Sequence, residues 1–232
     1  MSLQCLRAKV LSVLMILAGI PALPAQPKDD GPQHLVEIRT SLGVLIVALY
    51  NETPLHRDNF LELVRDQYYD SLCFHRIIPG FMVQGGDPGS KHAAAGMPLG
   101  TGGPDYKIPA EILPGMYHKK GALAAARQGD QVNPAKESSG SQFYIVQGRT
   151  YQAAEMDMMS KRNANMGTPV SYDDEAKRTY ATQGGAPHLD GAYTVFGEVI
   201  EGLDVLDRIA AVERDQHDRP LVDVRMWMKV LE

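Results

Sequence analysis

The stretch FHRIIPGFMVQGGDP, residues 74–88, contains two short strand candidates. They run from Phe74 to Ile78 and from Phe81 to Gly85, with a turn at Pro79-Gly80 between them. Residues two apart in a strand share a face, so Arg76 lies on an apolar face of the first strand. An arginine there normally pairs with an acidic residue, and the two strand candidates contain none. The stretch also lacks serine and cysteine, which excludes these nucleophiles from it.

Strand patterns of the same kind recur along the chain and define the fold class. The candidates are His34 to Thr40, Val44 to Tyr50, Phe74 to Ile78, Phe81 to Gly85, Gly121 to Arg127, Gln142 to Gln147, Thr194 to Ile200 and Leu221 to Leu231. One helix is expected to begin at Thr53-Pro54, with threonine as N-cap, and another to span Leu203 to Val212. This pattern predicts a mainly β fold, a closed eight-stranded antiparallel β-barrel capped by two α-helices. In the last strand, Val222 is expected on the same face as Val224.

The strand pattern stops between residues 149 and 187. Tyr151 to Arg162 and Tyr172 to Thr182 are polar and amphipathic, which is typical of two helices. We therefore expect a helical insertion at about 149–187 that packs beside the barrel. Because the barrel pattern is complete without the insertion, we also expect the barrel to fold when it is removed.

The first 25 residues differ in composition from the rest of the chain. Arg7 and Lys9 precede the apolar run Val10 to Ile20, and small residues follow as far as Ala25. This order is typical of a secretory signal peptide. The run is about half the roughly 20 residues that a membrane span needs, so we expect no permanent membrane anchor. The sequence predicts a signal peptide at 1–25, a linker at 26–33 and a single exported domain at 34–232, located in the periplasm.

Composition limits the classes of partner. The chain has 232 residues, of which 44% are hydrophobic and 22% charged, as in ordinary soluble globular proteins. A formal net charge of -5 gives no broad basic surface, so we expect no nucleic-acid partner. Cys5 lies inside the predicted signal peptide, which leaves Cys73 as the single thiol of the exported chain. That chain would have no internal disulfide and would depend on its core for stability.

Common catalytic groups are missing from the pattern. The 7 histidines lie far apart, with no pair at the spacing of a metal site, and no G-x-S-x-G nucleophile elbow occurs. A reaction that needs neither a cofactor nor a covalent intermediate fits best, and rotation about an X-Pro amide bond is such a reaction. Its barrier, about 18–20 kcal/mol for a peptide bond, comes from the resonance lost when the amide twists. An arginine that donates to the prolyl nitrogen stabilises only the twisted state, as catalysis requires.

Four motifs then resemble one family over most of the chain, from about His34 to Glu232. FHRIIPGFMVQGGDP, GALAAAR, SGSQFYI and LDGAYTVFGEVIEG occur in the order in which the cyclophilin family of peptidyl-prolyl cis–trans isomerases has them. The resemblance implies an eight-stranded barrel capped by two helices, in agreement with the strand pattern.

The resemblance also implies a site, transferred here position by position. The catalytic arginine of the family corresponds to Arg76 and its backbone-binding glutamine to Gln84. The substrate-binding positions fall on Phe81, Met82, Ala126, Arg127, Gln142, Tyr144, His188, Leu189 and Tyr193. No metal position and no cofactor are implied.

Four of these positions depart from the best-known pattern of the family. Tyr144 stands where phenylalanine is usual, and Arg127 replaces an asparagine of many eukaryotic members. His188 takes the place of a tryptophan, and Tyr193 that of a histidine. The resemblance implies a monomeric isomerase of proline-containing polypeptides that assists the folding of exported proteins. The alternative is a cyclophilin-like binding module with little turnover, and intact Arg76 favours the enzyme.

Overall fold

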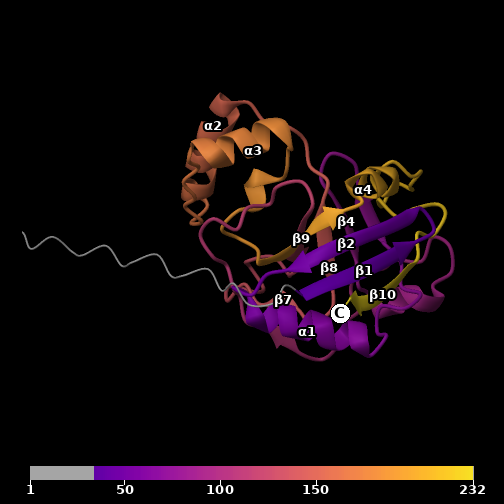
Figure 1. Ribbon diagram of the computed structural model, residues 1–232. Coiled ribbons are helices and arrows are strands. Elements are labelled where there is room, and N and C mark those ends of the chain that lie inside the picture. The colour runs from indigo at the N-terminus through magenta and orange to yellow at the C-terminus, as the bar shows by residue number, and fades with distance from the viewer. Residues whose placement is uncertain (1–33, 232) are drawn as a thin grey trace, which may run out of the picture.

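The computed structural model of the protein describes residues 34–231. The predicted signal peptide and linker, and with them Cys5, lie outside the described residues. Figure 1 shows a curved sheet flanked by helices, with two further helices to one side. Within the described part of the chain, no helix is long and apolar enough to cross a membrane.

One antiparallel sheet of eight strands forms the body of the molecule. Its order is β10-β1-β2-β9-β6-β8-β4-β3. The bounds are β1 (His34–Thr40), β2 (Gly43–Leu49), β3 (Arg76–Ile78), β4 (Met82–Gly85), β6 (Ala122–Ala125), β8 (Phe143–Val146), β9 (Val195–Glu201) and β10 (Met226–Leu231). The mainly β class and the eight strands are as predicted. A second pair, β5 (Lys107–Ile108) with β7 (Ser138–Ser139), had no sequence signal.

The predicted closure of the barrel is not confirmed, because β3 and β10 are the two ends of the sheet. Between them lies a seam, residues 71–74 beside residues 224–226, with one isolated β-bridge, Cys73 to Arg225. Single backbone hydrogen bonds, such as Phe74 N–H to the Val224 carbonyl (3.0 Å), complete it. The last strand begins at Met226 rather than at Leu221. Residues 221–224 precede the strand, so the prediction that Val222 shares a face with Val224 is wrong: Val224 is buried and Val222 is exposed.

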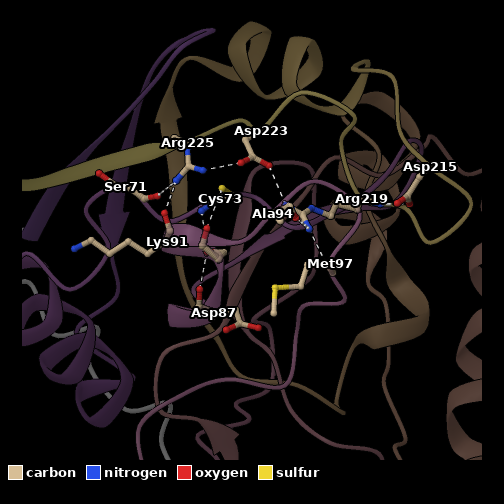
Figure 2. A network of polar contacts seen from close by, with 11 residues as sticks. Ser71, Cys73, Asp87, Lys91, Ala94, Met97, Asp215, Arg219, Asp223 and Arg225 are labelled. Carbon is tan, nitrogen blue, oxygen red and sulfur yellow. Dashed lines mark hydrogen bonds and ion pairs between the residues drawn. The ribbon is translucent and has the colours of Figure 1, made fainter.

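Side chains join the two edges of the seam where the ladder is incomplete (Figure 2). Arg225 donates to the carbonyls of Ser71 and Lys91, each at 2.8 Å, and pairs with Asp223 at 2.7 Å. Asp223 also pairs with buried Arg219, which donates to the carbonyls of residues 94 and 97. The two edges are therefore tied by a few backbone hydrogen bonds and by arginine contacts to loop carbonyls, without a continuous strand ladder.

Helices α1 (Pro54–Arg65) and α4 (Leu203–Ala210) lie at the two ends of the curved sheet (Figure 1). Thr53 is the N-cap of α1 as predicted, although its side chain makes no cap hydrogen bond. Helix α4 ends two residues before the predicted Val212. It begins after Gly202, which has a φ of 91°. A Cβ at this position would lie 2.4 Å from the Val44 carbonyl oxygen, so only glycine fits.

The main core fills the concave side of the sheet. Strand alternation directs Val36 and Ile38 of β1 and Leu45 and Val47 of β2 inward, and all four are fully buried. Phe60 of α1 packs against this core together with the aromatic rings of Tyr69, Phe143 and Phe196. A protein without a disulfide in its described residues is held together mainly by this burial of apolar surface.

The helical insertion contains α2 (Ala153–Asn165) and α3 (Asp174–Thr182), each starting two residues later than the sequence pattern suggests. Both helices lie beside the sheet (Figure 1). They enclose a small core of their own, formed by Tyr151, Met156, Tyr172, Ala176 and Tyr180. Two short 3-10 helices, η1 (Pro88–His92) and η2 (Pro187–Leu189), complete the described elements, and η2 directly follows the insertion.

Candidate active site

Arg76 and Gln84 face each other across the hairpin of β3 and β4. The antiparallel register places Arg76 opposite Gln84. Gly80 in the connecting turn has a φ of 73°, which favours glycine. Because opposite residues on one face of a hairpin lie side by side, Nη1 of Arg76 reaches Oε1 of Gln84 at 3.4 Å. The two residues predicted as catalytic are therefore in contact, and the Arg76 side chain stays exposed to an incoming ligand.

A second glutamine fixes the orientation of Gln84. Gln142, one residue before β8, accepts a 3.0 Å hydrogen bond from Nε2 of Gln84 through its own Oε1. Nε2 of Gln142 donates to the carbonyls of Gly100 (3.0 Å) and Gly102 (2.7 Å). Each amide can satisfy these partners in one orientation only. That orientation leaves Oε1 of Gln84 directed at Arg76.

Buried Asp87 anchors the glycine loop, residues 100–102, from its other side. Its Oδ2 accepts the backbone N–H groups of Gly100 and Gly102. A Cβ on Gly102 would lie 2.2 Å from Oδ1 of Asp87, so the approach requires glycine. Sequence reasoning missed this arrangement. The available signal was Asp87 directly after the Gly85-Gly86 pair, with a second glycine pair, Gly102-Gly103, nearby in the sequence.

The hairpin and three other segments enclose a cavity of about 260 Å³. Its walls are Arg76, Phe81, Met82, Gln84, Ala126, Arg127, Tyr144, Leu189 and Tyr193. All were predicted as site residues. The two remaining predicted residues lie behind the wall: Gln142 contacts Gln84, and the His188 ring packs on the Phe81 ring at 5.1 Å between centroids. The cavity thus combines apolar side chains with two guanidinium groups and an amide, and its lining contains no carboxylate, thiol or imidazole.

Arg127, the second arginine of the cavity, is already occupied. Its Nε donates to the Ala192 carbonyl at 2.9 Å, and Nη1 pairs with Asp130 at 2.6 Å. The guanidinium carbon also lies 4.4 Å from the centre of the Tyr193 ring, a cation–π geometry. Arg127 therefore supports the Tyr193 wall, whereas Arg76 keeps donors for a ligand.

Two buried groups beside the cavity had no sequence signal. His75, next to Arg76, is 5% exposed, and neither of its ring nitrogens has a hydrogen-bond partner in the structure. Burial lowers the pKa of His75 to about 4, so the imidazole is neutral at pH 7. His118 lies behind the opposite wall, where its Nε2 is 3.0 Å from the Tyr144 hydroxyl. Burial raises the pKa of Tyr144 well above its usual value.

The sequence matches the family model described as "Cyclophilin type peptidyl-prolyl cis-trans isomerase/CLD" over residues 35–229. A peptidyl-prolyl cis-trans isomerase of Arabidopsis thaliana is 34% identical over 193 residues, which are 82% of this chain and 91% of the relative. A putative isomerase of Staphylococcus aureus is 35% identical over 193 residues, covering 82% and 87% of the two chains. A putative bifunctional phosphatase/isomerase of Streptococcus pyogenes is 36% identical over 200 residues, 84% of this chain but 37% of that relative.

Solved structures give the same fold. A cyclophilin type peptidyl-prolyl cis-trans isomerase of Cryptosporidium parvum aligns with a TM-score of 0.64 at 24% identity, covering 87% of this chain and 99% of that one. The same protein in the presence of the dipeptide Ala-Pro aligns with a TM-score of 0.62. With the family model matched over nearly all of the described residues, this chain belongs to the cyclophilin-type peptidyl-prolyl cis–trans isomerases.

Proposed function

We propose that the protein assists the folding of exported proteins by catalysing rotation about their X-Pro bonds, with Arg76 as the catalytic residue. The observation that carries the proposal is the position of the Arg76 guanidinium. It lies on the wall of a cavity of about 260 Å³ next to apolar side chains, is held by Gln84 and is still exposed. A twisting X-Pro amide needs a hydrogen-bond donor near the prolyl nitrogen. The cavity lining contains no carboxylate that would compete for the guanidinium.

The cavity wall suits a proline ring. Phe81, Met82 and Leu189 offer apolar surface, and the Tyr144 ring adds an aromatic face. When the X-Pro bond rotates, the prolyl nitrogen becomes pyramidal and regains a lone pair. A donor from Arg76 stabilises that lone pair and has no partner in the planar amide, so its effect appears in the transition state alone. Apolar walls exclude the water that would stabilise the planar form.

Export supports the choice of substrate. The signal-like pattern of residues 1–25 favours a location outside the cytoplasm, where newly translocated chains arrive unfolded. Cis–trans isomerisation of X-Pro bonds takes tens to hundreds of seconds without a catalyst and can limit folding. Extended, proline-containing chains are therefore the substrate class that we propose.

The test compares Arg76→Ala with Arg65→Ala, which removes an exposed arginine on α1 that does not line the cavity. A hydrogen bond to a charged group contributes about 1.5–3 kcal/mol, so Arg76→Ala should lower kcat/KM on an X-Pro peptide roughly tenfold or more. Arg65→Ala should leave kcat/KM unchanged. Normal turnover by folded Arg76→Ala protein would remove Arg76 from the mechanism. Peptide binding without turnover by the unmodified protein would favour the binding module instead.

A further inference from the structure

The hydroxyl of Tyr144 enters a buried hydrogen-bonded chain that leads away from the cavity. Nε2 of His118 lies 3.0 Å from this hydroxyl, and Nδ1 of His118 lies 2.8 Å from Oδ1 of Asp190. The backbone N–H of His118 donates to the same Oδ1 at 2.7 Å. His118 is fully buried and Asp190 is 2% exposed. The chain is therefore shielded from water along its whole length.

The second oxygen of Asp190 is held by the helical insertion. Its Oδ2 accepts the hydroxyls of Tyr172 at 2.8 Å and of Tyr180 at 2.6 Å. Tyr180 belongs to α3, and Tyr172 lies two residues before it. Within residues 34–231, no lysine or arginine forms an ion pair with Asp190. Its carboxylate is stabilised by hydrogen-bond donors alone, two of which come from the insertion.

These contacts fix the direction of the hydrogen bonds that His118 and Tyr180 make to Asp190. A carboxylate only accepts, so the Tyr180 hydroxyl and Nδ1–H of His118 donate to Asp190. The Tyr172 hydroxyl lies within hydrogen-bond distance of two acceptors, Oδ2 of Asp190 at 2.8 Å and the Pro187 carbonyl at 3.0 Å. Nε2 of His118 and the Tyr144 hydroxyl then form the next hydrogen bond of the chain, which gives this buried hydroxyl its partner. The Tyr144 ring, stacked on His118 at an interplanar angle of 13°, is held by both contacts.

The insertion also holds the segment that follows it. Asn163 of α2 donates from Nδ2 to the Pro187 carbonyl at 3.0 Å and to the Tyr172 hydroxyl at 3.3 Å. Pro187 begins η2, which ends at Leu189 of the cavity wall. Asn163 of α2 thus contacts Pro187, two residues before Leu189, and Tyr180 of α3 contacts Asp190, the residue after Leu189. Both helices of the insertion therefore hold the segment that carries Leu189 of the cavity wall.

We propose that the insertion positions the proline-binding wall through a relay, defined as Tyr172, Tyr180, Asp190, His118 and Tyr144. This inference rests on the proposed function. The first four are positioning residues, since only Tyr144 lines the cavity. The relay shares no residue with the chain from Gly100 and Gly102 through Gln142 and Gln84 to Arg76. Damage to the relay should therefore weaken substrate binding and leave the chemical step intact. The strand pattern predicts that the barrel still folds when the insertion is removed. Its removal would, however, take two hydrogen-bond donors away from Asp190.

The first test is Tyr180→Phe, which deletes one hydroxyl and keeps the ring. The matched control is Tyr117→Phe. The Tyr117 ring packs in the same aromatic cluster, but its hydroxyl donates to the Ser171 carbonyl rather than to Asp190. On an X-Pro peptide, Tyr180→Phe should raise KM about threefold or more with little change in kcat, and Tyr117→Phe should change neither. A fall in kcat at constant KM, or equal effects of the two variants, would overturn the relay.

A double-mutant cycle separates the relay from a general structural role. His118→Leu should raise KM about tenfold in the unmodified protein, because the Tyr144 hydroxyl is left buried without a partner. In a Tyr144→Phe background there is no hydroxyl to satisfy, so the same substitution should change KM less than about twofold. An equal effect in both backgrounds would show that His118 acts by another route, and the relay would be wrong.

Two further measurements keep the inference testable. If His118→Leu does not fold, the same cycle with Tyr180→Phe and Tyr144→Phe replaces it, and additive effects on KM count against the relay. If the unmodified protein binds an X-Pro peptide without isomerising it, the proposed function has failed. The relay is then tested by the calorimetric Kd for that peptide. His118→Leu should weaken peptide binding in the otherwise unmodified protein and should leave it nearly unchanged in the Tyr144→Phe background.

Discussion

Nε2 of Gln84 donates to Oε1 of Gln142 across 3.0 Å, and this contact joins the hairpin of Arg76 to the start of the neighbouring strand β8, whose Tyr144 also lines the cavity. It also fixes the direction of the hydrogen bonds that run from Arg76 through the two glutamines to residues 100–102. Gln84 can present only its oxygen to Arg76, and Gln142 can present only its nitrogen to the glycine loop at residues 100–102.

We expect Gln142→Glu to impair catalysis although it is nearly isosteric. The carboxylate can accept from Gln84 but cannot donate to the carbonyls of Gly100 and Gly102, which it would repel. The loss of two hydrogen bonds and of the fixed amide should lower kcat/KM roughly tenfold. Gln183→Glu, at the exposed end of α3, is the control and should have no effect. Equal kcat/KM for Gln142→Glu and the unmodified protein would show that Gln142 does not orient the site.

We expect kcat/KM to be nearly flat between about pH 7 and 9, because the reaction requires no proton transfer. The pKa of Tyr144 is raised well above its usual value by burial, so its hydroxyl stays protonated throughout this range. The pKa of His188 is lowered, chiefly by burial, so the imidazole on Phe81 is neutral there. Initial rates on one X-Pro peptide across this range check the prediction, and a bell-shaped profile would reveal a general acid or base.

We expect the folded protein to lose stability between about pH 6.5 and 4 because of His75. Its folded pKa of about 4 lies below the ordinary value of 6.5, so the unfolded chain binds the proton more readily in this interval. The stabilising contribution is complete above about pH 6.5 and disappears as the pH falls toward 4. At about pH 4.5 the linkage amounts to roughly 2–3 kcal/mol.

Urea unfolding of His75→Gln at pH 7 and pH 4.5 measures this contribution. His217→Gln, at an exposed histidine, is the matched control. The stability difference between the two pH values should shrink in His75→Gln and persist in the control. An unchanged difference in both variants would assign the acid sensitivity to other groups.

We expect Cys73 to be unreactive in the folded protein. The side chain is 1% exposed, and burial raises the pKa of its thiol to about 11, which leaves little thiolate at pH 8. A disulfide reagent applied to the chain from residue 26 onward should label Cys73 only in urea. Lys161→Cys, at an exposed position of α2, should react at once and serves as the control. Immediate labelling of the unmodified folded protein would contradict the burial of Cys73.

The predictable part of the fold is the part with local periodicity. Alternation marked β1, an apolar run marked β2, and helical spacing marked α2 and α3 within three residues of their bounds. Val222 misled the strand assignment because it continues the alternation of Val224 and Met226, although the chain leaves the sheet there. Local sequence carries no information on where a partner strand ends, so neither this error nor the incomplete closure could be read from it.

The site likewise has a part that the sequence predicts and a part that it does not. Residues of the cavity wall lie within motifs and could be predicted one by one. Asp87 and His118 act through partners 13 and 72 residues away in the chain, Gly100 and Asp190. A lone aspartate and a lone histidine have no periodicity to mark them, and only the folded chain brings their partners to them.

The seam between β3 and β10 places Arg76, the proposed catalytic residue, at an edge of the sheet that is weakly held. Arg76 is the first residue of an edge strand of three residues, and the two edges of the seam meet through a few single backbone hydrogen bonds and side-chain contacts rather than a continuous ladder. Edges with few ladder hydrogen bonds open by local fluctuations well below the free energy of global unfolding. Amide protons of residues 74–77 should therefore exchange with solvent before those of β1 and β2. On warming, isomerase turnover should decline while the rest of the sheet is still intact, so that heat inactivation of this enzyme begins as a parting of two strand edges rather than as melting of its core.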